Sequence, residues 1–169
     1  MMATDPHPDS ALYQLAYSAG DALKSRGWYC ATAESCTGGG IASAITSIAG
    51  SSAWFACGWV TYSNISKEQL LGVSADALEK QGAVSEAVVR QMAEGAQKKS
   101  GVDITVAVSG VAGPDGGTAE KPVGMVCIAW TTRTQTESTT FMFDGNRADV
   151  RLQTIEAALN GLIRLCCVS

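Results

Sequence analysis

A serine and a lysine are the residues of this chain whose types and surroundings best suit chemistry. Ser35 lies in a glycine-rich run, residues 34–40, between an apolar stretch typical of a strand and one typical of a helix. Amides at a helix N-terminus bind anions, so an alkoxide or an oxyanion at Ser35 would be stabilised there. Lys67, which follows the next strand-like stretch, could take the serine proton if its pKa falls from about 10.4 towards 7 or 8.

Each of these residues also has a purely structural interpretation. A serine in a glycine-rich loop commonly hydrogen-bonds its own backbone, and a lysine at the start of a helix is usually solvated. Cys36 competes with Ser35 as the nucleophile because helix N-termini lower thiol pKa values, although a thiol there is more often packed. Glu34 either orients Lys67 or a hydroxyl, or caps the backbone. Tyr62 either relays a proton or packs as a half-buried strand residue.

A single histidine limits the chemistry that the chain can perform. His7 lies between two prolines near the N-terminus, far in sequence from the glycine-rich run. We therefore expect neither a Ser-His-Asp or Cys-His site within one chain nor a histidine-rich metal site. The six cysteines show no C-x-x-C spacing, which argues against a zinc site or a redox motif. We expect no metal and no cofactor.

Length and composition indicate one ordinary globular domain. The chain has 169 residues, of which 46% are hydrophobic and 17% charged. A net charge of −4 without a basic stripe argues against a nucleic-acid-binding protein. No apolar run reaches the roughly 18–20 residues that span a bilayer, and no signal peptide is recognisable. We expect a flexible leader over residues 1–10 and one cytoplasmic domain over residues 11–169, bound to neither nucleic acid nor a membrane.

Strand-like and helix-like segments alternate along the chain and end in a hairpin followed by a helix. The expected helices cover residues 10–26, 41–49, 66–71, 74–81, 85–99 and 148–165. The expected strands cover residues 28–33, 54–62, 103–108, 125–132 and 136–143. Ser66, Ser74 and Ser85 are the expected N-caps of three helices. This order predicts a single α/β domain, a three-layer α/β/α fold with a mixed, mostly parallel sheet.

A second glycine-rich loop, residues 109–117, follows another expected strand. Loops at the carboxyl ends of parallel strands gather ligand sites, so the two loops could meet at one edge. A plain turn around Pro114 is the alternative for this loop. Lys121, Arg147 and Arg151 are candidate phosphate partners, although each alone is more commonly a surface charge. The residues thus favour a serine–lysine hydrolase with anion-binding loops and do not name a substrate.

Six ordered blocks of the sequence strongly resemble the CinA C-terminal domain family, in particular its stand-alone nicotinamide-nucleotide amidohydrolases. The blocks are A-E-S-C-T-G-G from residue 33, A-G-S-S-A-W-F from 49, V-T-Y-S-N from 60, G-A-V-S from 82, S-G-V-A-G-P-D-G-G from 109 and K-P-V-G from 121. The similarity runs from about Leu12 to Leu165. It implies an α/β/α domain that hydrolyses nicotinamide mononucleotide to nicotinate mononucleotide and ammonia in pyridine-nucleotide recycling, without a metal, as a homodimer or a larger homo-oligomer.

The resemblance also implies roles for individual residues. Ser35 matches the nucleophile and Lys67 the base, with Tyr62 beside them. The residues implied to bind the substrate are Glu34, Thr37, Gly38, Gly39, Ser51, Ser109, Ala112, Gly113 and, facing the phosphate, Arg147. Amides of residues 36–38 or near Gly110 are the expected oxyanion donors.

Two questions stay open at the level of sequence. Ser51 is the alternative nucleophile if Ser35 is only structural. The competing hypotheses for the whole chain are a non-catalytic nucleotide-binding or regulatory module that uses the same loops, and an amidase that acts on another carboxamide.

Overall fold

The computed structural model describes residues 10–167, so His7 and nearly all of the expected leader lie outside the described residues. The helices of the described part are α1 (Ala11–Arg26), α2 (Gly40–Thr46), α3 (Asn64–Leu71), α4 (Ala75–Gln81), α5 (Glu86–Ser100), α6 (Arg147–Cys167) and the short 3-10 helix η1 (Ser51–Ala53). Its strands are β1 (Cys30–Glu34), β2 (Phe55–Val60), β3 (Ile104–Gly110), β4 (Met125–Thr132) and β5 (Thr136–Met142). Every expected helix and strand is present, with ends shifted by a few residues.

The five strands form one mixed sheet in the order β2-β1-β3-β4-β5. The β2–β1 and β1–β3 pairs are parallel, whereas β3–β4 and β4–β5 are antiparallel. The expected mixed sheet is confirmed, but its parallel share is half of the strand pairs and therefore smaller than expected. The reason is the β4–β5 hairpin, which extends the sheet without a helical crossover.

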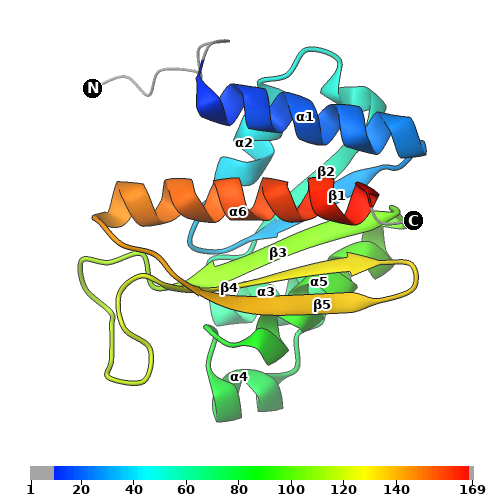
Figure 1. Ribbon diagram of the computed structural model, residues 1–169. Helices are drawn as coiled ribbons and strands as arrows, with labels where there is room; N and C mark the ends of the chain where they lie inside the picture. Colours follow the sequence, from blue (N-terminus) through cyan, green and yellow to red (C-terminus); the bar gives the residue numbers. More distant parts are fainter. Residues whose placement is uncertain (1–9, 168–169) are drawn as a thin grey trace.

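Helices cover both faces of the sheet and make the three layers of the fold (Figure 1). One core lies between the sheet and α1, α2 and α6, and includes Leu23, Ile45 and Leu159. The other lies between the sheet and α3, α4 and α5, and includes Met92. Side chains alternate along β3, so Val106 packs in the first core and its neighbour Ala107 in the second. The expected three-layer α/β/α architecture is confirmed.

The start of α3 differs from the sequence expectation in a way that matters for the site. Ser63, rather than Ser66, is the N-cap: its hydroxyl accepts a hydrogen bond of 3.1 Å from the amide of Ser66. The prediction of Ser66 as the cap is wrong because Ser63 offers the same capping chemistry three residues earlier. The earlier start puts Lys67 inside the helix, where its side chain is buried. Ser74 and Ser85 are confirmed as N-caps of α4 and α5.

The parallel strands bring three chain segments together at one edge of the sheet, the edge formed by the carboxyl ends of β2, β1 and β3. Because β2, β1 and β3 run in the same direction, the residues that follow them emerge together. These are the turn after Glu34, the segment from Thr61 and the loop after Gly110. The start of α6 lies at the same end of the molecule, next to the loop that follows β3 (Figure 1).

Candidate active site

Ser35 and Lys67 meet at this edge. Lys67 Nζ lies 3.1 Å from Ser35 Oγ, within hydrogen-bond distance. The lysine side chain also donates to the carbonyl of Thr61 at 2.8 Å and, more distantly, to that of Tyr62 at 3.4 Å. Ser35 follows the end of β1 and Lys67 comes from α3, so the β1–β2 pairing and the helix after β2 set their separation.

The surroundings of Lys67 favour a neutral amine. Its residue is only 1% exposed, and burial lowers its pKa from the ordinary lysine value. Among residues 10–167 no carboxylate forms an ion pair or hydrogen bond with Nζ. A neutral amine has two N–H donors and one lone pair. The carbonyls of Thr61 and Tyr62 match the donors, which leaves the lone pair for the hydroxyl of Ser35.

Glu34 caps the backbone and does not orient Lys67. Its carboxylate is fully buried and accepts hydrogen bonds from the Ile41 amide at 2.9 Å and the Ala42 amide at 2.8 Å, in the first turn of α2. It also accepts a 2.6 Å hydrogen bond from the hydroxyl of Thr37. The helix N-terminus stabilises this negative charge. Glu34 therefore holds the turn that carries Ser35, and of the two sequence interpretations the capping one applies.

Cys36 is a weak rival to Ser35. Its side chain packs in the core beneath α2, and burial raises the pKa of its thiol to about 11. Such a thiol is protonated at neutral pH and is a poor nucleophile. The helix N-terminus does not overcome this effect of burial.

The turn after Ser35 leaves two amides for an oxyanion. The amide of Gly38 donates to the carbonyl of Ser35 at 3.0 Å, so the expectation that it serves as an oxyanion donor is wrong. Within the described residues, the amides of Cys36 and Thr37 donate to no carbonyl. Gly38 and Gly39 have φ values of +60° and +93°, which side chains rarely adopt, so the reversal into α2 requires glycine there.

A cavity of about 650 Å³ opens beside the turn, at the start of α6. It is lined by Ala112, Pro114, Val123, Gly145, Asn146, Arg147, Ala148 and Arg151. Arg147 connects the start of α6 to two other segments. Its guanidinium donates to the Gly113 carbonyl at 2.9 Å and to the Tyr62 hydroxyl at 3.2 Å. Tyr62 is 62% exposed; its hydroxyl contacts Arg147, which lines the cavity, while its carbonyl accepts from Lys67. The predicted residues Tyr62, Ala112, Gly113 and Arg147 are thus brought together.

Ser109 also lies at this edge. It is the penultimate residue of β3, and the amide of Ser35 donates to the carbonyl of the preceding Val108 at 3.1 Å. Its side chain is buried, and its hydroxyl forms no hydrogen bond within the described part of the chain. A bound ligand at this edge could use that hydroxyl.

Two predicted residues lie elsewhere. Ser51 precedes β2, whose first residue pairs with Cys30 at the start of β1, whereas Ser35 follows the end of β1. The length of β1 therefore separates Ser51 from Lys67, about 16 Å at ~3.3 Å per residue. Within one chain Ser51 thus does not lie beside Lys67, because α2 carries the chain back to the opposite edge; its role as substrate ligand or alternative nucleophile stays a prediction. Lys121 donates to the carbonyl of Gln81 at the end of α4 and does not line the cavity.

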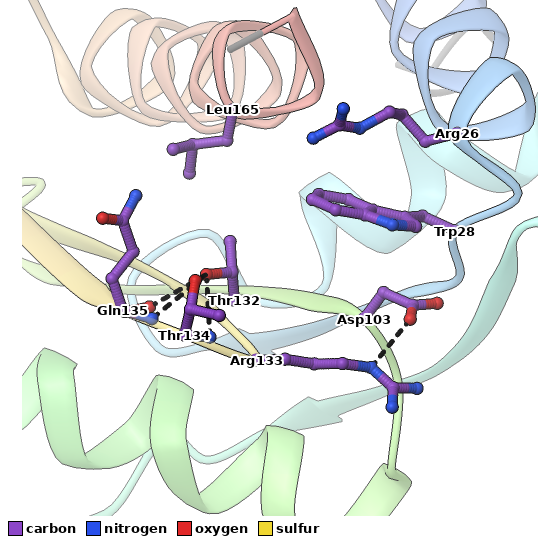
Figure 2. A pocket seen from close by; sticks show the side chains of 8 residues that line it. All are labelled: Arg26, Trp28, Asp103, Thr132, Arg133, Thr134, Gln135 and Leu165. Atoms are coloured by element: carbon purple, nitrogen blue, oxygen red, sulfur yellow. Dashed lines mark hydrogen bonds and ion pairs between the residues drawn. The ribbon is translucent and has the colours of Figure 1, made fainter. Parts of the chain in front are cut away.

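A separate cavity of about 490 Å³ lies at that opposite edge (Figure 2). It is lined by Arg26, Trp28, Asp103, Thr132, Arg133, Thr134, Gln135 and Leu165. Figure 2 shows the guanidinium of Arg26 over the ring of Trp28, 4.6 Å from its centroid. None of the residues predicted to do chemistry lines this cavity, so it is not the candidate active site.

Sequence reasoning missed the backbone groups of the site and the position of one arginine. The carbonyl of Thr61 has no signature in the sequence because every residue has a carbonyl. Arg151 was a candidate phosphate partner, but its guanidinium donates to the carbonyl of Thr37 at 2.8 Å. No group of three or more metal-ligating side chains occurs among residues 10–167, and no helix there is long and apolar enough to cross a membrane.

The chain is similar over most of its length to several known proteins. The chain is 52% identical to the nicotinamide-nucleotide amidohydrolase PncC of Escherichia coli K12 over 155 residues, which are 91% of this chain and 94% of that protein. It is 53% identical to the protein of the same name from Pseudomonas putida, over 89% of this chain and 94% of the relative. A CinA-like protein of Geotalea daltonii is 54% identical over 142 residues, 84% of this chain but 34% of that longer protein.

The solved structures show the same fold. The competence/damage inducible protein CihA of Agrobacterium tumefaciens superimposes with a TM-score of 0.90 at 43% identity, covering 97% of this chain and 99% of the other. The family model of the CinA C-terminal domain matches residues 12–166. With nearly the whole chain matched, the protein belongs to the CinA C-terminal domain family.

Proposed function

We propose that this protein is an amidohydrolase that converts nicotinamide mononucleotide to nicotinate mononucleotide and ammonia. The observation that carries the proposal is the buried contact of 3.1 Å between Lys67 Nζ and Ser35 Oγ, with no carboxylate of residues 10–167 paired to the lysine. Support comes from the relatives of about 52% identity, which are named nicotinamide-nucleotide amidohydrolases.

The mechanism begins with proton transfer. Neutral Lys67 takes the hydroxyl proton of Ser35, and the serine oxygen attacks the carboxamide carbon. The amides of Cys36 and Thr37 donate to the oxyanion, and one such preorganised donor lowers a barrier by about 3–4 kcal/mol. The lysine ammonium then returns its proton to the departing nitrogen, which leaves as ammonia. Water hydrolyses the acyl-enzyme, with Lys67 again as the base.

The nucleotide part of the substrate would occupy the neighbouring cavity. Its volume of about 650 Å³ lies in the range of small-molecule sites. Arg147 at its wall offers a planar guanidinium to a phosphate. The hydroxyl of Ser109, the backbone of Gly39 and the turn at Ala112–Gly113 would surround the ribose and the ring, while the buried hydroxyl of Thr37 supports the turn through its bond to Glu34. This reaction serves pyridine-nucleotide recycling, and we place it in the cytoplasm.

Ammonia release from nicotinamide mononucleotide by the purified protein tests the proposal. We expect release by the wild type and losses on the order of 10³-fold or more in Ser35→Ala and Lys67→Met. Ser18→Ala and Lys80→Met are matched controls, because both residues are exposed and lie on α1 and α4, away from the site. Undiminished release by both site variants would contradict the dyad. Tight nucleotide binding without release by the wild type would favour a regulatory binding module instead.

The assembly is part of the same proposal. We expect a homodimer or larger homo-oligomer, and β2 offers a candidate contact, because among the described strands β1 alone pairs with it and its other side lies at the border of the sheet. Light scattering after size-exclusion chromatography measures the assembly directly, and a monomer at micromolar concentration would contradict this part.

A further inference from the structure

Arg151 connects the last helix to the turn that carries the nucleophile. Its Nη2 donates a 2.8 Å hydrogen bond to the carbonyl of Thr37, a residue 114 positions earlier in the chain. The same nitrogen lies so close to the turn that a Cβ on Gly38 would sit 3.7 Å from it. The guanidinium therefore lies directly against the backbone between Ser35 and α2.

The contact completes a set of hydrogen bonds that fixes this turn. The carbonyl of Thr37 also accepts from the amide of Gly40 at 3.1 Å, and the amide of Gly38 donates to the carbonyl of Ser35. The hydroxyl of Thr37 is bound to Glu34. The peptide between residues 37 and 38 is thus held at its oxygen and at its nitrogen. The two amides proposed to bind the oxyanion, those of Cys36 and Thr37, donate to no carbonyl of the described residues.

Stability does not account for an arginine at this position. Its Nε is buried and has no hydrogen-bond partner among the described residues, and an unpaired buried donor destabilises a fold. No carboxylate within residues 10–167 forms an ion pair with Arg151. The guanidinium also opposes the rise of the Cys36 thiol pKa, which shows that its positive charge reaches the nucleophile turn.

We propose that Arg151 is a positioning residue, which holds the carbonyl of Thr37 so that the amides of Cys36 and Thr37 face the developing oxyanion. The inference rests on the proposed amidohydrolase function. The proposal gives Arg151 a different role from Arg147, which lies one turn earlier on α6. The guanidinium of Arg147 donates to the Gly113 carbonyl and the Tyr62 hydroxyl at the wall of the cavity. Under this proposal Arg147 contacts the nucleotide, whereas Arg151 affects catalysis only by holding the backbone of the turn at Thr37.

Hydrogen exchange tests the structural part without any need for activity. In Arg151→Met, the amides of Gly38 and Gly40 should exchange at least about tenfold faster than in the wild type, because the turn loses a tether. Arg164→Met is the matched control on the same helix, since Arg164 pairs with Glu137 away from the site. Unchanged exchange at both amides would overturn the proposal. If Arg151→Met does not fold, Arg151→Lys takes its place, since one ammonium donor should retain part of the protection.

Steady-state kinetics with two substrates test the catalytic part. For nicotinamide mononucleotide and for nicotinamide riboside, which lacks the phosphate, Arg151→Met should lower kcat by similar factors. We expect roughly 10- to 100-fold, less than for loss of a direct oxyanion donor. KM should change little, and Arg151→Lys should recover part of kcat. A rise in KM for the nucleotide alone would make Arg151 a phosphate ligand and overturn the proposal. A wild type that releases no ammonia would refute the proposed function, while the exchange result would still decide the role of Arg151 in the turn.

Discussion

At the scale of single residues, the candidate site depends on a lysine that has no acidic partner in the described part of the chain. Lys67 is buried against two carbonyls and one hydroxyl. The carboxylate nearest in sequence to Ser35, that of Glu34, accepts hydrogen bonds from the first amides of α2 instead of contacting the lysine. A charged ammonium is costly in such a place, and the neutral form is favoured. Burial and the lack of an acidic partner among the described residues therefore suit Lys67 to the proposed role of base.

The pH dependence of the reaction follows from this environment. Burial lowers the pKa of Lys67, so the active neutral form is reached at a lower pH than for a free lysine, whose pKa is about 10.4. We expect kcat/KM to rise with pH, with slope one on a logarithmic plot, and to level off above the lowered pKa. Lys67→Met should abolish this limb. A rate that rises only above about pH 10 would contradict a depressed lysine.

The lowered pKa of Lys67 also predicts how the stability of the fold depends on pH. Lys67 binds its proton less tightly in the folded chain than in the unfolded chain, so the unfolded state carries more protons between the two pKa values. The free energy of unfolding should therefore rise with pH across that interval, and Lys67→Met should remove this contribution.

At the scale of elements, the start of α3 determines where the lysine lies. The Ser63 cap lets the helix begin at Asn64, which turns the side chain of Lys67 inward towards Ser35. Both serines of the segment could cap a helix by chemistry alone. The choice between them depends on where the chain leaves β2, and that position is set by the pairing of Val60 with Glu34.

Removal of this cap should affect stability and activity together. Ser63→Ala should lower the free energy of unfolding by about 1 kcal/mol and should also reduce ammonia release, because the first turn of α3 frays next to Lys67. Ser74→Ala is the matched control: it removes the cap of α4, a helix without site residues, and should cost similar stability while activity is retained. Equal activity in the two variants would contradict the positioning role of α3. Urea unfolding and the ammonia assay measure the two effects.

Local patterns predicted the elements well and the contacts between them only in part. Periodicity and capping signals predicted the six α-helices and five strands of the described residues but not the 3-10 helix η1, and the strand ends indicated that the two glycine-rich loops could meet at one edge. The position of Ser51 could not be predicted from its motif, because which edge it reaches depends on the path of α2 across the sheet. The contact of Arg151 with Thr37 joins residues far apart in the chain, and a local pattern carries no information on such a pair.

At the scale of the whole molecule, the site is assembled from both helical layers. Lys67 comes from the layer of α3, α4 and α5, whereas Arg147 and Arg151 come from α6 in the other layer, with the sheet between them (Figure 1). The relative position of these groups therefore depends on how closely each helix packs on the sheet. On α6, Gly161 packs directly against a tryptophan of the sheet.

The packing of α6 on the sheet should be sensitive to a single methyl group. A Cβ at Gly161 would lie 2.1 Å from the ring of Trp130, whose indole N–H donates to the carbonyl of Ala158 at 3.0 Å. In Gly161→Ala the ring must move or α6 must lift, and overpacking of this kind costs about 1–3 kcal/mol of unfolding free energy. Asn160→Ala, at the exposed neighbouring position, should change it by no more than about 0.5 kcal/mol. Because α6 also carries Arg147 and Arg151, KM should rise and kcat should fall in Gly161→Ala, whereas neither should change in the control. An unchanged free energy of unfolding in Gly161→Ala would contradict this prediction, because it would mean that α6 or the Trp130 ring can shift without cost.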